Sequence, residues 1–185
     1  MTPRLLLFAG PNGSGKTTIT TPETLAYYQI PLERYLNADE IARSLKEARP
    51  DLLQEERERE AFRQARQLRW SYREEGLSFA FETVFSHPST LLDIQQCRAV
   101  GFEIVVLFVT TENPEINVGR VAGRYRAGGH DVPVDRIHAR YHRVMALLPR
   151  IIEDSDRATV FDNSASPLLA FPFRQGKPLP SQDVL

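Results

Sequence analysis

The chain has 185 residues, of which 42% are hydrophobic and 25% are charged, and this composition is typical of an ordered globular protein rather than a disordered chain. A domain usually contains about 100 to 200 residues, so we expect a single domain that spans residues 1–185. The 23 basic residues are balanced by 24 acidic residues, which excludes the overall positive charge that nucleic-acid-binding proteins usually carry.

Two features bear on where the protein acts. Its only cysteine, Cys97, cannot form a disulfide within the chain, and we expect it to be a partly buried helix residue. The apolar run at residues 5–9 is too short for a signal peptide or a membrane span. The sequence therefore predicts a cytoplasmic protein without a membrane partner.

Strands and helices are predicted to alternate along the chain. The first half predicts a buried strand at 5–9, a weaker strand at 35–37, helices at 38–48 and 51–75, and a buried strand at 78–83. The second half predicts a helix at 89–100, a strand at 102–109, helices at 114–127 and 134–152, and a last core strand at 158–161. This alternation favours an α/β fold with a mainly parallel sheet and helices on both faces.

Two further segments have patterns of their own. In the long helix, one side is expected to pack against the core, and this side carries Phe62, Ala65, Leu68 and Tyr72, with Trp70 as a further packing residue. The tail from Ser166 is rich in proline and predicts a hairpin at the sheet edge, over about 166–185, that turns near Gly176 and Lys177.

A glycine-rich motif follows the first strand and precedes a predicted helix. It matches the phosphate-binding P-loop and consists of Gly10, Pro11, Asn12, Gly13, Ser14, Gly15, Lys16 and Thr17, with Thr18 after it. In such a loop the backbone N–H groups point at the phosphates, the lysine contacts the terminal phosphates and the threonine ligates Mg²⁺. Because the chain has only three lysines, a chance lysine at position 16 is improbable. We therefore predict binding of ATP or GTP with Mg²⁺, with the side chain of Lys16 exposed in the loop.

Acidic residues from two segments of the chain are expected at the carboxyl edge of the sheet, where α/β proteins bind ligands. Asp39 and Glu40 follow the second strand, and a carboxylate there can accept a proton from a substrate hydroxyl or hold a Mg²⁺-bound water. The alternative is that both residues only complement the helix dipole in the first turn. Glu82 ends the strand at 78–83 and is followed by Thr83, and the pair can bind a substrate hydroxyl, unless Glu82 is merely paired at the surface.

The segment from 118 to 150 concentrates positive charge. It holds only two acidic residues but seven arginines, which are at positions 120, 124, 126, 136, 140, 143 and 150. Two helices joined by a turn at Gly128–Asp131 and lined with arginine are typical of a lid, about 114–150, that neutralises charge on a transferred phosphoryl group. The alternative is a solvated helical face.

The motifs together resemble those of the zeta-toxin family of P-loop kinases, over about residues 4 to 164. The matching segments are GPNGSGKTT, NADEIA, FET, RVxxR leading into GGHDVP, IxxRY and DNS. The resemblance implies a nucleotide-kinase-like three-layer sandwich. It also implies phosphorylation of a UDP-linked amino sugar by ATP or GTP, as the toxin of a toxin–antitoxin pair. ABC-transporter ATPases have the same P-loop sequence, but this chain is too short for such an ATPase and lacks the ABC signature motif.

The resemblance also assigns residue roles. Asp39 would be the general base, Glu82 would bind the acceptor, and Arg124 and Arg140 would contact the γ-phosphate, with Arg120 as a nucleotide-binding alternative to Arg124 in the same RVxxR segment.

Other activities stay open from the sequence alone. A nucleic-acid 5′-hydroxyl kinase would use the same loop and lid but needs a basic track along the strand, so nucleic acid is not the expected partner. A non-catalytic nucleotide switch would need the P-loop without a base. A scaffold protein would have no need of Lys16. The expected partners are a nucleotide, a small-molecule acceptor such as a nucleotide sugar, and a protein antitoxin.

Overall fold

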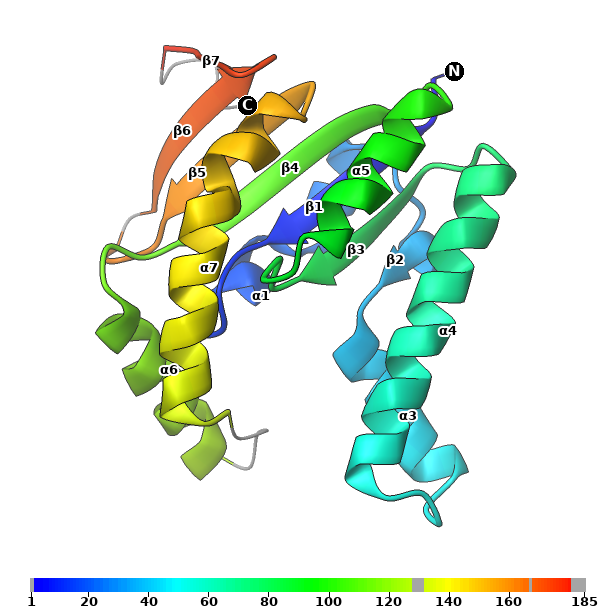
Figure 1. Ribbon diagram of the computed structural model, residues 1–185, viewed down its shortest axis with the longest axis vertical. Coiled ribbons are helices and arrows are strands. Elements are labelled where there is room, and N and C mark those ends of the chain that lie inside the picture. Colours follow the sequence, from blue (N-terminus) through cyan, green and yellow to red (C-terminus); the bar gives the residue numbers. More distant parts are fainter. Residues whose placement is uncertain (1, 128–131, 167, 181–185) are drawn as a thin grey trace.

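In the computed structural model, which describes residues 2–127, 132–166 and 168–180, seven strands form one sheet in the order β2-β3-β1-β4-β5-β6-β7 (Figure 1). The strands are β1 (Arg4–Ala9), β2 (Tyr35–Leu36), β3 (Phe79–Thr83), β4 (Glu103–Thr110), β5 (Arg157–Asp162), β6 (Leu169–Arg174) and β7 (Lys177–Pro178). Strands β2, β3, β1, β4 and β5 pair in parallel. Strands β6 and β7 add an antiparallel hairpin at the β5 edge, which turns through Gln175 and Gly176.

The helices connect the parallel strands. They are α1 (Lys16–Ile19), α2 (Pro22–Tyr27), α3 (Ala38–Ala48), α4 (Gln54–Glu74), α5 (Ser89–Ala99), α6 (Pro114–Arg126) and α7 (Val134–Glu153). The helix after the P-loop is short because Pro22 starts a separate helix, α2. Helix α6 begins as its sequence predicts, with Pro114 in its first turn and the side chain of Asn113 accepting a hydrogen bond from the Glu115 N–H.

Helices cover both faces of the sheet, which explains why the central strands are continuously apolar. Leu5 and Leu7 of β1 pack into a large cluster beneath α5 and α7, whereas Leu6 and Phe8 pack into a second cluster with Leu25 of α2. Figure 1 shows α5 and α7 in front of the sheet and α1 behind it. The predicted three-layer α/β architecture is therefore confirmed.

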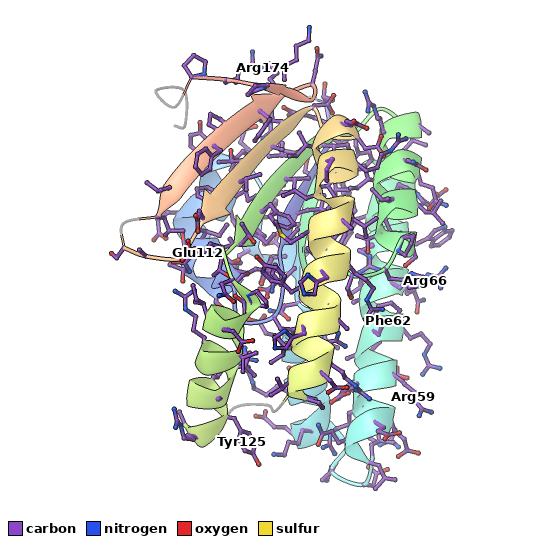
Figure 2. The ribbon with its side chains drawn as sticks, turned by 60° about the vertical axis from the view of Figure 1, so that its left-hand side comes forward. Arg59, Phe62, Arg66, Glu112, Tyr125 and Arg174 are labelled. Carbon is purple, nitrogen blue, oxygen red and sulfur yellow. The ribbon has the colours of Figure 1, made fainter. Side chains whose placement is uncertain are left out.

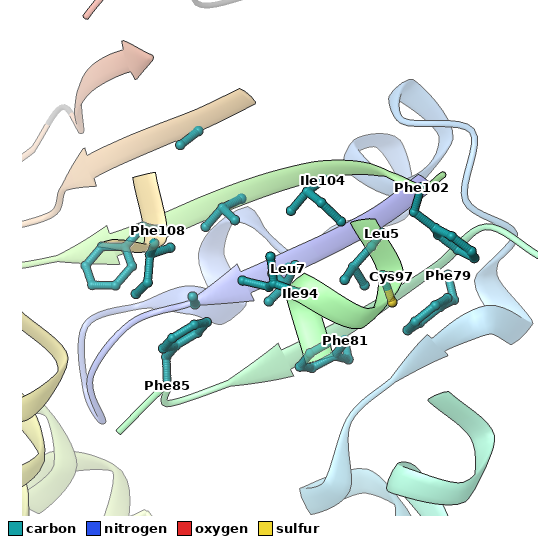
Figure 3. Close-up of a cluster of buried hydrophobic side chains, with 14 of the residues drawn as sticks. Leu5, Leu7, Phe79, Phe81, Phe85, Ile94, Cys97, Phe102, Ile104 and Phe108 are labelled. Atoms are coloured by element: carbon teal, nitrogen blue, oxygen red, sulfur yellow. The ribbon is translucent and has the colours of Figure 1, made fainter. Parts of the chain in front are cut away.

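The larger cluster contains a group of aromatic rings around the sheet centre (Figure 3). The ring of Phe79 contacts those of Phe81 and Phe102, with centroids 6.4 and 6.0 Å away. Cys97 lies in the same cluster with 3% of its surface exposed, so the expectation of partial burial was wrong. Its position on the sheet-facing side of α5, beside Ile94, places the thiol in the core.

The expected core side of α4 was also partly wrong. Phe62, labelled in Figure 2, and Trp70 are each 57% exposed and Leu68 is 38% exposed. Ala61 and Ala65 are buried. The helix turns its small residues inward, and the half-buried Arg69 lies one turn further along the same side. Its guanidinium lies 4.6 Å from the centroid of the Phe81 ring.

The remaining expectations concern the lid and membrane contact. The predicted hinge at 128–131 lies outside the described residues. Over the described ranges, every helix is too short or too polar to cross a membrane.

Candidate active site

The P-loop lies between β1 and α1, and its glycines are required by both conformation and space. Gly10, Gly13 and Gly15 have φ angles of 144°, 76° and 98°, which side chains of L-residues rarely adopt. Cβ atoms added there would lie 2.0 Å from the Val109 carbonyl oxygen, 2.6 Å from that of Asn117 and 2.2 Å from Nδ2 of Asn163, respectively. The loop is therefore held closely by β4, α6 and the segment after β5.

The other loop residues divide between buried and accessible positions. Pro11 and Ser14 are buried, and Asn12 is half-buried. Thr17 and Thr18, at the start of α1, are exposed. The hydroxyl of Thr17 is thus accessible to a ligand, as the P-loop pattern requires.

Lys16 is buried, with only 8% of its surface exposed, and this corrects the expectation that its side chain is exposed in the loop. Its Nζ donates hydrogen bonds to the carbonyl oxygens of Gly10 and Pro11, at 3.1 and 3.3 Å. Burial lowers the pKa of Lys16, while the carboxylates of Glu82 and Asp39 act in the opposite direction. The side chain of Lys16 therefore folds back over its own loop.

Glu82 joins the loop lysine to the second strand. Its Oε1 lies 3.8 Å from Nζ of Lys16, and its Oε2 accepts a hydrogen bond of 3.2 Å from the hydroxyl of Tyr35. Nδ2 of Asn37 lies 3.2 Å from the Tyr35 hydroxyl and 3.5 Å from the same carboxylate oxygen. Because β3 pairs with β1 in the sheet, the end of β3 lies beside the P-loop, as the sequence predicts for a nucleotide-kinase strand order.

Asp39 lies in the first turn of α3 and is exposed. Asn37 caps this helix through Oδ1, which accepts a hydrogen bond of 2.9 Å from the Asp39 N–H. Asp39 is close enough to Lys16 to oppose the fall in its pKa. The residue therefore occupies a first helical turn and also contributes to the electrostatics of the loop lysine, so both interpretations of the sequence fit its position. Glu40, also in that turn, is exposed.

Thr83 has a different local role. Its Oγ1 accepts a hydrogen bond of 3.0 Å from the Phe85 N–H, and Phe85 has a left-handed φ of 58°. The hydroxyl therefore stabilises the turn that follows β3. A contact between Thr83 and a substrate stays a prediction.

Three arginines of the segment that is predicted to form a lid, Arg120, Arg124 and Arg140, differ in their contacts with the loop. Arg124 is close enough to Lys16 to lower its pKa. Nη1 of Arg140 donates a hydrogen bond of 3.2 Å to Oδ1 of Asn12. Arg120 lies at the other side of the loop, where Nη2 donates to the Asn163 carbonyl oxygen at 2.7 Å and Nη1 lies 3.5 Å from that of Ser14. This geometry separates Arg120 from Arg124, which the sequence left as alternatives.

Sequence reasoning missed a group of buried polar residues that supports the loop. Asn117 of α6 is fully buried, donates from Nδ2 to the Asn12 carbonyl oxygen at 2.8 Å, and hydrogen-bonds the Thr111 hydroxyl. The hydroxyl of Tyr141 in α7 donates to the Thr111 carbonyl oxygen at 2.6 Å. A signal for Asn117 exists in the sequence, because it is four residues from the buried Val121 and so lies on the apolar side of α6.

A second missed residue, Asn163, lies just after β5. Its Nδ2 donates a hydrogen bond of 2.8 Å to the carbonyl oxygen of Ser14 in the loop. The DNS segment matched the family pattern, but its contact with the P-loop depends on the neighbouring positions of β5 and β1 across β4, which the sequence does not give.

The site also fits Mg²⁺ held largely by nucleotide phosphates. Among the described residues, no group of three or more His, Cys, Asp or Glu side chains is placed to hold a metal by itself. Mg²⁺ commonly takes only one or two protein ligands beside phosphates and waters. The exposed Thr17 hydroxyl, with the nearby carboxylates of Asp39 and Glu82, supplies ligands of the oxygen type that Mg²⁺ prefers.

Comparison with solved structures supports the fold. The complex of AvrRxo1-ORF1 with AvrRxo1-ORF2, solved with sulphate ions, is 18% identical with a TM-score of 0.74, covering 96% of this chain and 60% of that chain. The same complex with ATP gives a TM-score of 0.73 at 17% identity. A structure of the PezAT chromosomal toxin–antitoxin system of Streptococcus pneumoniae is 18% identical with a TM-score of 0.65, covering 89% of this chain and 70% of that one. The chain thus spans about 60% of the length of the AvrRxo1 chain that it matches.

Sequence comparison addresses the family. An uncharacterized protein of Haemophilus influenzae is 25% identical over 138 residues, which are 75% of this chain and 92% of that protein. The model of the family described as zeta toxin matches residues 1–169, which include the P-loop, both carboxylates and all three lid arginines. The resemblance seen in the motifs is confirmed, and the chain belongs to the zeta toxin family.

Proposed function

We propose that the protein is a Mg²⁺-dependent kinase that transfers the γ-phosphoryl group of ATP or GTP to a hydroxyl group of a small molecule. The observation that carries this proposal is the grouping of charged residues around Lys16: Oε1 of Glu82 lies 3.8 Å from its Nζ, and Glu82, Asp39 and Arg124 all affect its pKa. Positive and negative side chains around a P-loop lysine are suited to hold a nucleotide and an acceptor together.

The P-loop, residues 10–18, is proposed to bind the phosphates, with Arg120 beside it as a further nucleotide contact. Lys16 would exchange its carbonyl partners for the terminal phosphates, and backbone N–H groups of the loop would donate to the β-phosphate. A bound Mg²⁺ neutralises charge on the phosphates, and Thr17 is proposed to hold it. The presence of ATP in a solved structure of the same fold supports a nucleoside triphosphate as donor.

Asp39 is proposed as the general base, with Glu82 and Thr83 contacting the acceptor. Asp39 is exposed and contributes to the electrostatics of the loop lysine, so an acceptor hydroxyl can reach both its carboxylate and the γ-phosphate. In the reaction the hydroxyl proton passes to Asp39 and the new oxygen–phosphorus bond forms. The bond from the γ-phosphorus to its bridging oxygen breaks, and the nucleoside diphosphate leaves.

Arg124 and Arg140 are proposed to stabilise the charge on the γ-phosphoryl oxygens. Arg140 lies on Asn12 of the loop, and Arg124 lies close to Lys16, so both helices α6 and α7 bring a cation to the phosphates. We propose that α6 and α7 form a lid over about residues 114–150. Its closure over bound substrates would limit hydrolysis of the nucleotide.

Family membership supports a UDP-linked amino sugar as acceptor, a role as the toxin of a toxin–antitoxin pair, and a cytoplasmic location. The AvrRxo1 structures are complexes of two different proteins, and the PezAT structure is of a toxin–antitoxin system. We therefore propose a protein antitoxin as partner.

The experiment that tests the proposal is phosphoryl transfer from γ-labelled ATP and GTP to a panel of nucleotide sugars, with product mass as readout. We expect one acceptor to gain a single phosphoryl group, and the Lys16→Ala protein to give none. A 5′-hydroxyl oligonucleotide in the panel tests nucleic acid as acceptor. Nucleotide binding without a phosphorylated product from any acceptor would contradict the kinase proposal and favour a nucleotide-binding switch.

A further inference from the structure

The distance between Lys16 and Glu82 is unusually long for two oppositely charged groups that are both largely shielded from solvent. Their side chains are 9% and 17% exposed, yet Nζ lies 3.8 Å from Oε1, beyond the roughly 2.7–2.9 Å of a direct charge-assisted hydrogen bond. Attraction in such a site favours closer approach. The Gly10 and Pro11 carbonyl oxygens hold Nζ on its own loop, so the separation depends also on what holds the carboxylate.

The hydrogen-bond donors on the far side of Glu82 supply that restraint. The Tyr35 hydroxyl donates to Oε2 at 3.2 Å, and Nδ2 of Asn37 lies within 3.5 Å of the same atom. Both residues belong to β2 or directly follow it, and β2 pairs with β3 through Tyr35 and Ala80, two residues before Glu82. Side chains two residues apart on a strand share one face, so Tyr35 and Glu82 meet on the same side of the sheet.

The ring of Tyr35 is itself fixed. It makes an edge contact with Phe8 of β1, with ring centroids 6.0 Å apart and an interplanar angle of 89°. Burial and the adjacent Glu82 carboxylate raise the pKa of Tyr35, so the phenol stays protonated and donates. The hydrogen bonds from Tyr35 and Asn37 to Glu82, which we call the tether, therefore include one from a side chain that is fixed in the sheet.

We propose that Tyr35 is a positioning residue that, with Asn37, holds the Glu82 carboxylate back from Lys16 and so keeps the ammonium group free for a nucleotide phosphate. The inference rests on the proposed function, in which Lys16 binds phosphate. Without these hydrogen bonds, the Glu82 carboxylate moves toward Lys16 and competes with the phosphate for the N–H donors of the ammonium group. With it, the carboxylate stays beside the site, where it can contact the acceptor.

A double-mutant cycle on ATP binding to the full chain tests this role, with calorimetry or a fluorescent ATP analogue as readout. Tyr35→Phe removes only the hydroxyl and should weaken ATP binding by about tenfold, the lower end of the effect of one hydrogen bond to a charged group. In a Glu82→Gln background the same change should alter ATP affinity by less than about twofold, because no carboxylate is left to close on the lysine. Tyr72→Phe is a matched control, since its hydroxyl donates to the Glu33 carbonyl oxygen, away from the P-loop.

The outcomes separate this inference from the proposed function. A wild-type protein that binds no ATP overturns nucleotide binding and this inference with it. Unchanged ATP affinity in Tyr35→Phe overturns the tether alone. An equal loss of affinity in the wild-type and Glu82→Gln backgrounds also overturns it, because that result shows a packing effect.

A second variant keeps the test decisive if Tyr35→Phe melts well below wild type. Asn37→Ser tests the same tether, since serine keeps the α3 cap and removes the amide donor. It should weaken ATP binding only when the Glu82 carboxylate is present, and equal losses in both backgrounds overturn the proposal.

Discussion

Arg140 of α7 donates a hydrogen bond to the side-chain oxygen of Asn12, at 3.2 Å, and so joins α7 to the P-loop. Arg140 is half-buried, whereas its neighbours Arg136 and Arg143 on the same helix are exposed. The structure therefore distinguishes one arginine of the stripe from the others by contact with the site.

This contact leads to a prediction about the lid arginines. Arg140→Ala and Arg124→Ala should each lower kcat by about 10² or more with a small change in the nucleotide KM, because a cation that acts on transition-state charge is lost. Arg126→Ala is the control, because this arginine is in the same last turn of α6 but, unlike Arg124, is not among the charges that shift the pKa of Lys16. Steady-state kinetics of all three variants provide the measurement. An equal loss in Arg126→Ala would indicate a general effect of positive charge.

The buried side chain of Asn117 gives a prediction about stability. Asn117→Ala removes the side-chain donor to the Asn12 carbonyl oxygen and one of the two acceptors of the Thr111 hydroxyl, and an unpaired buried polar group costs about 1–3 kcal/mol. We expect that loss in urea unfolding, together with weaker ATP binding, because the P-loop backbone loses its support from α6. Gln67→Ala, at an exposed position of α4, should change neither quantity. Unfolding free energy equal to wild type would contradict a structural role for the Asn117 side chain.

The burial of Lys16 changes what its replacement should do. Lys16→Met should abolish transfer, since no ammonium group reaches the phosphates. Its unfolding free energy should stay within about 1 kcal/mol of wild type, because the lost bonds to the Gly10 and Pro11 carbonyls are offset by removing a buried charge. Unfolding in urea at neutral pH measures this balance. Loss of cooperative unfolding would show that the lysine is needed for folding itself.

The sequence predicted the layers of the fold because they depend on local patterns. The run from Leu5 to Ala9 has no polar residue, and the structure buries one half of it on each face of the sheet. The loop glycines were equally readable, since their motif and its place before a helix define the P-loop. The same rule failed for α4, where Arg69 takes a buried position by stacking on Phe81 and pairing with Asp93, 3.5 Å away. An arginine on the apolar side of a helix gives no sign of such partners in the sequence.

Only the site residues that belong to recognisable sequence motifs could be predicted. Lys16, Asp39 and Glu82 lie in segments with recognisable patterns, and the structure brings them together. Asn117 and Asn163 contact the loop from positions more than 100 residues away along the chain. Such contacts follow from the strand order, which places β4 and β5 beside β1, and not from any local pattern.

Cys97 gives a prediction about pH. Burial raises the pKa of its thiol from 9.0 to about 12, so between these values the unfolded chain releases a proton that the folded protein keeps. The thiol therefore contributes stability below pH 9 that is lost as the pH rises toward 12. We expect the unfolding free energy of wild type to fall by about 1 kcal/mol relative to Cys97→Ala between about pH 8 and pH 10. Native protein should also resist thiol-labelling reagents at about pH 8, and rapid labelling would contradict the buried position.

Asp39 is the residue whose role most needs a decisive variant. Asp39→Asn keeps the shape of the side chain and removes the proton acceptor, and the α3 cap is unaffected because it uses the Asp39 backbone N–H. If Asp39 is the base, transfer to the acceptor should be abolished while ATP affinity stays within about threefold, since Lys16 and the loop N–H groups still hold the phosphates.

A role in holding Mg²⁺ predicts a different result for the same variant. The Mg²⁺ requirement would rise, and high Mg²⁺ would partly restore transfer, because an amide oxygen is a weaker ligand than a carboxylate. Titration of Mg²⁺ against the transfer rate therefore separates the two roles. Glu40→Gln, in the same first turn of α3, is the matched control and should transfer at the wild-type rate. Wild-type transfer in Asp39→Asn would exclude both roles, because neither a base nor a metal ligand can lose its charge without effect at this position.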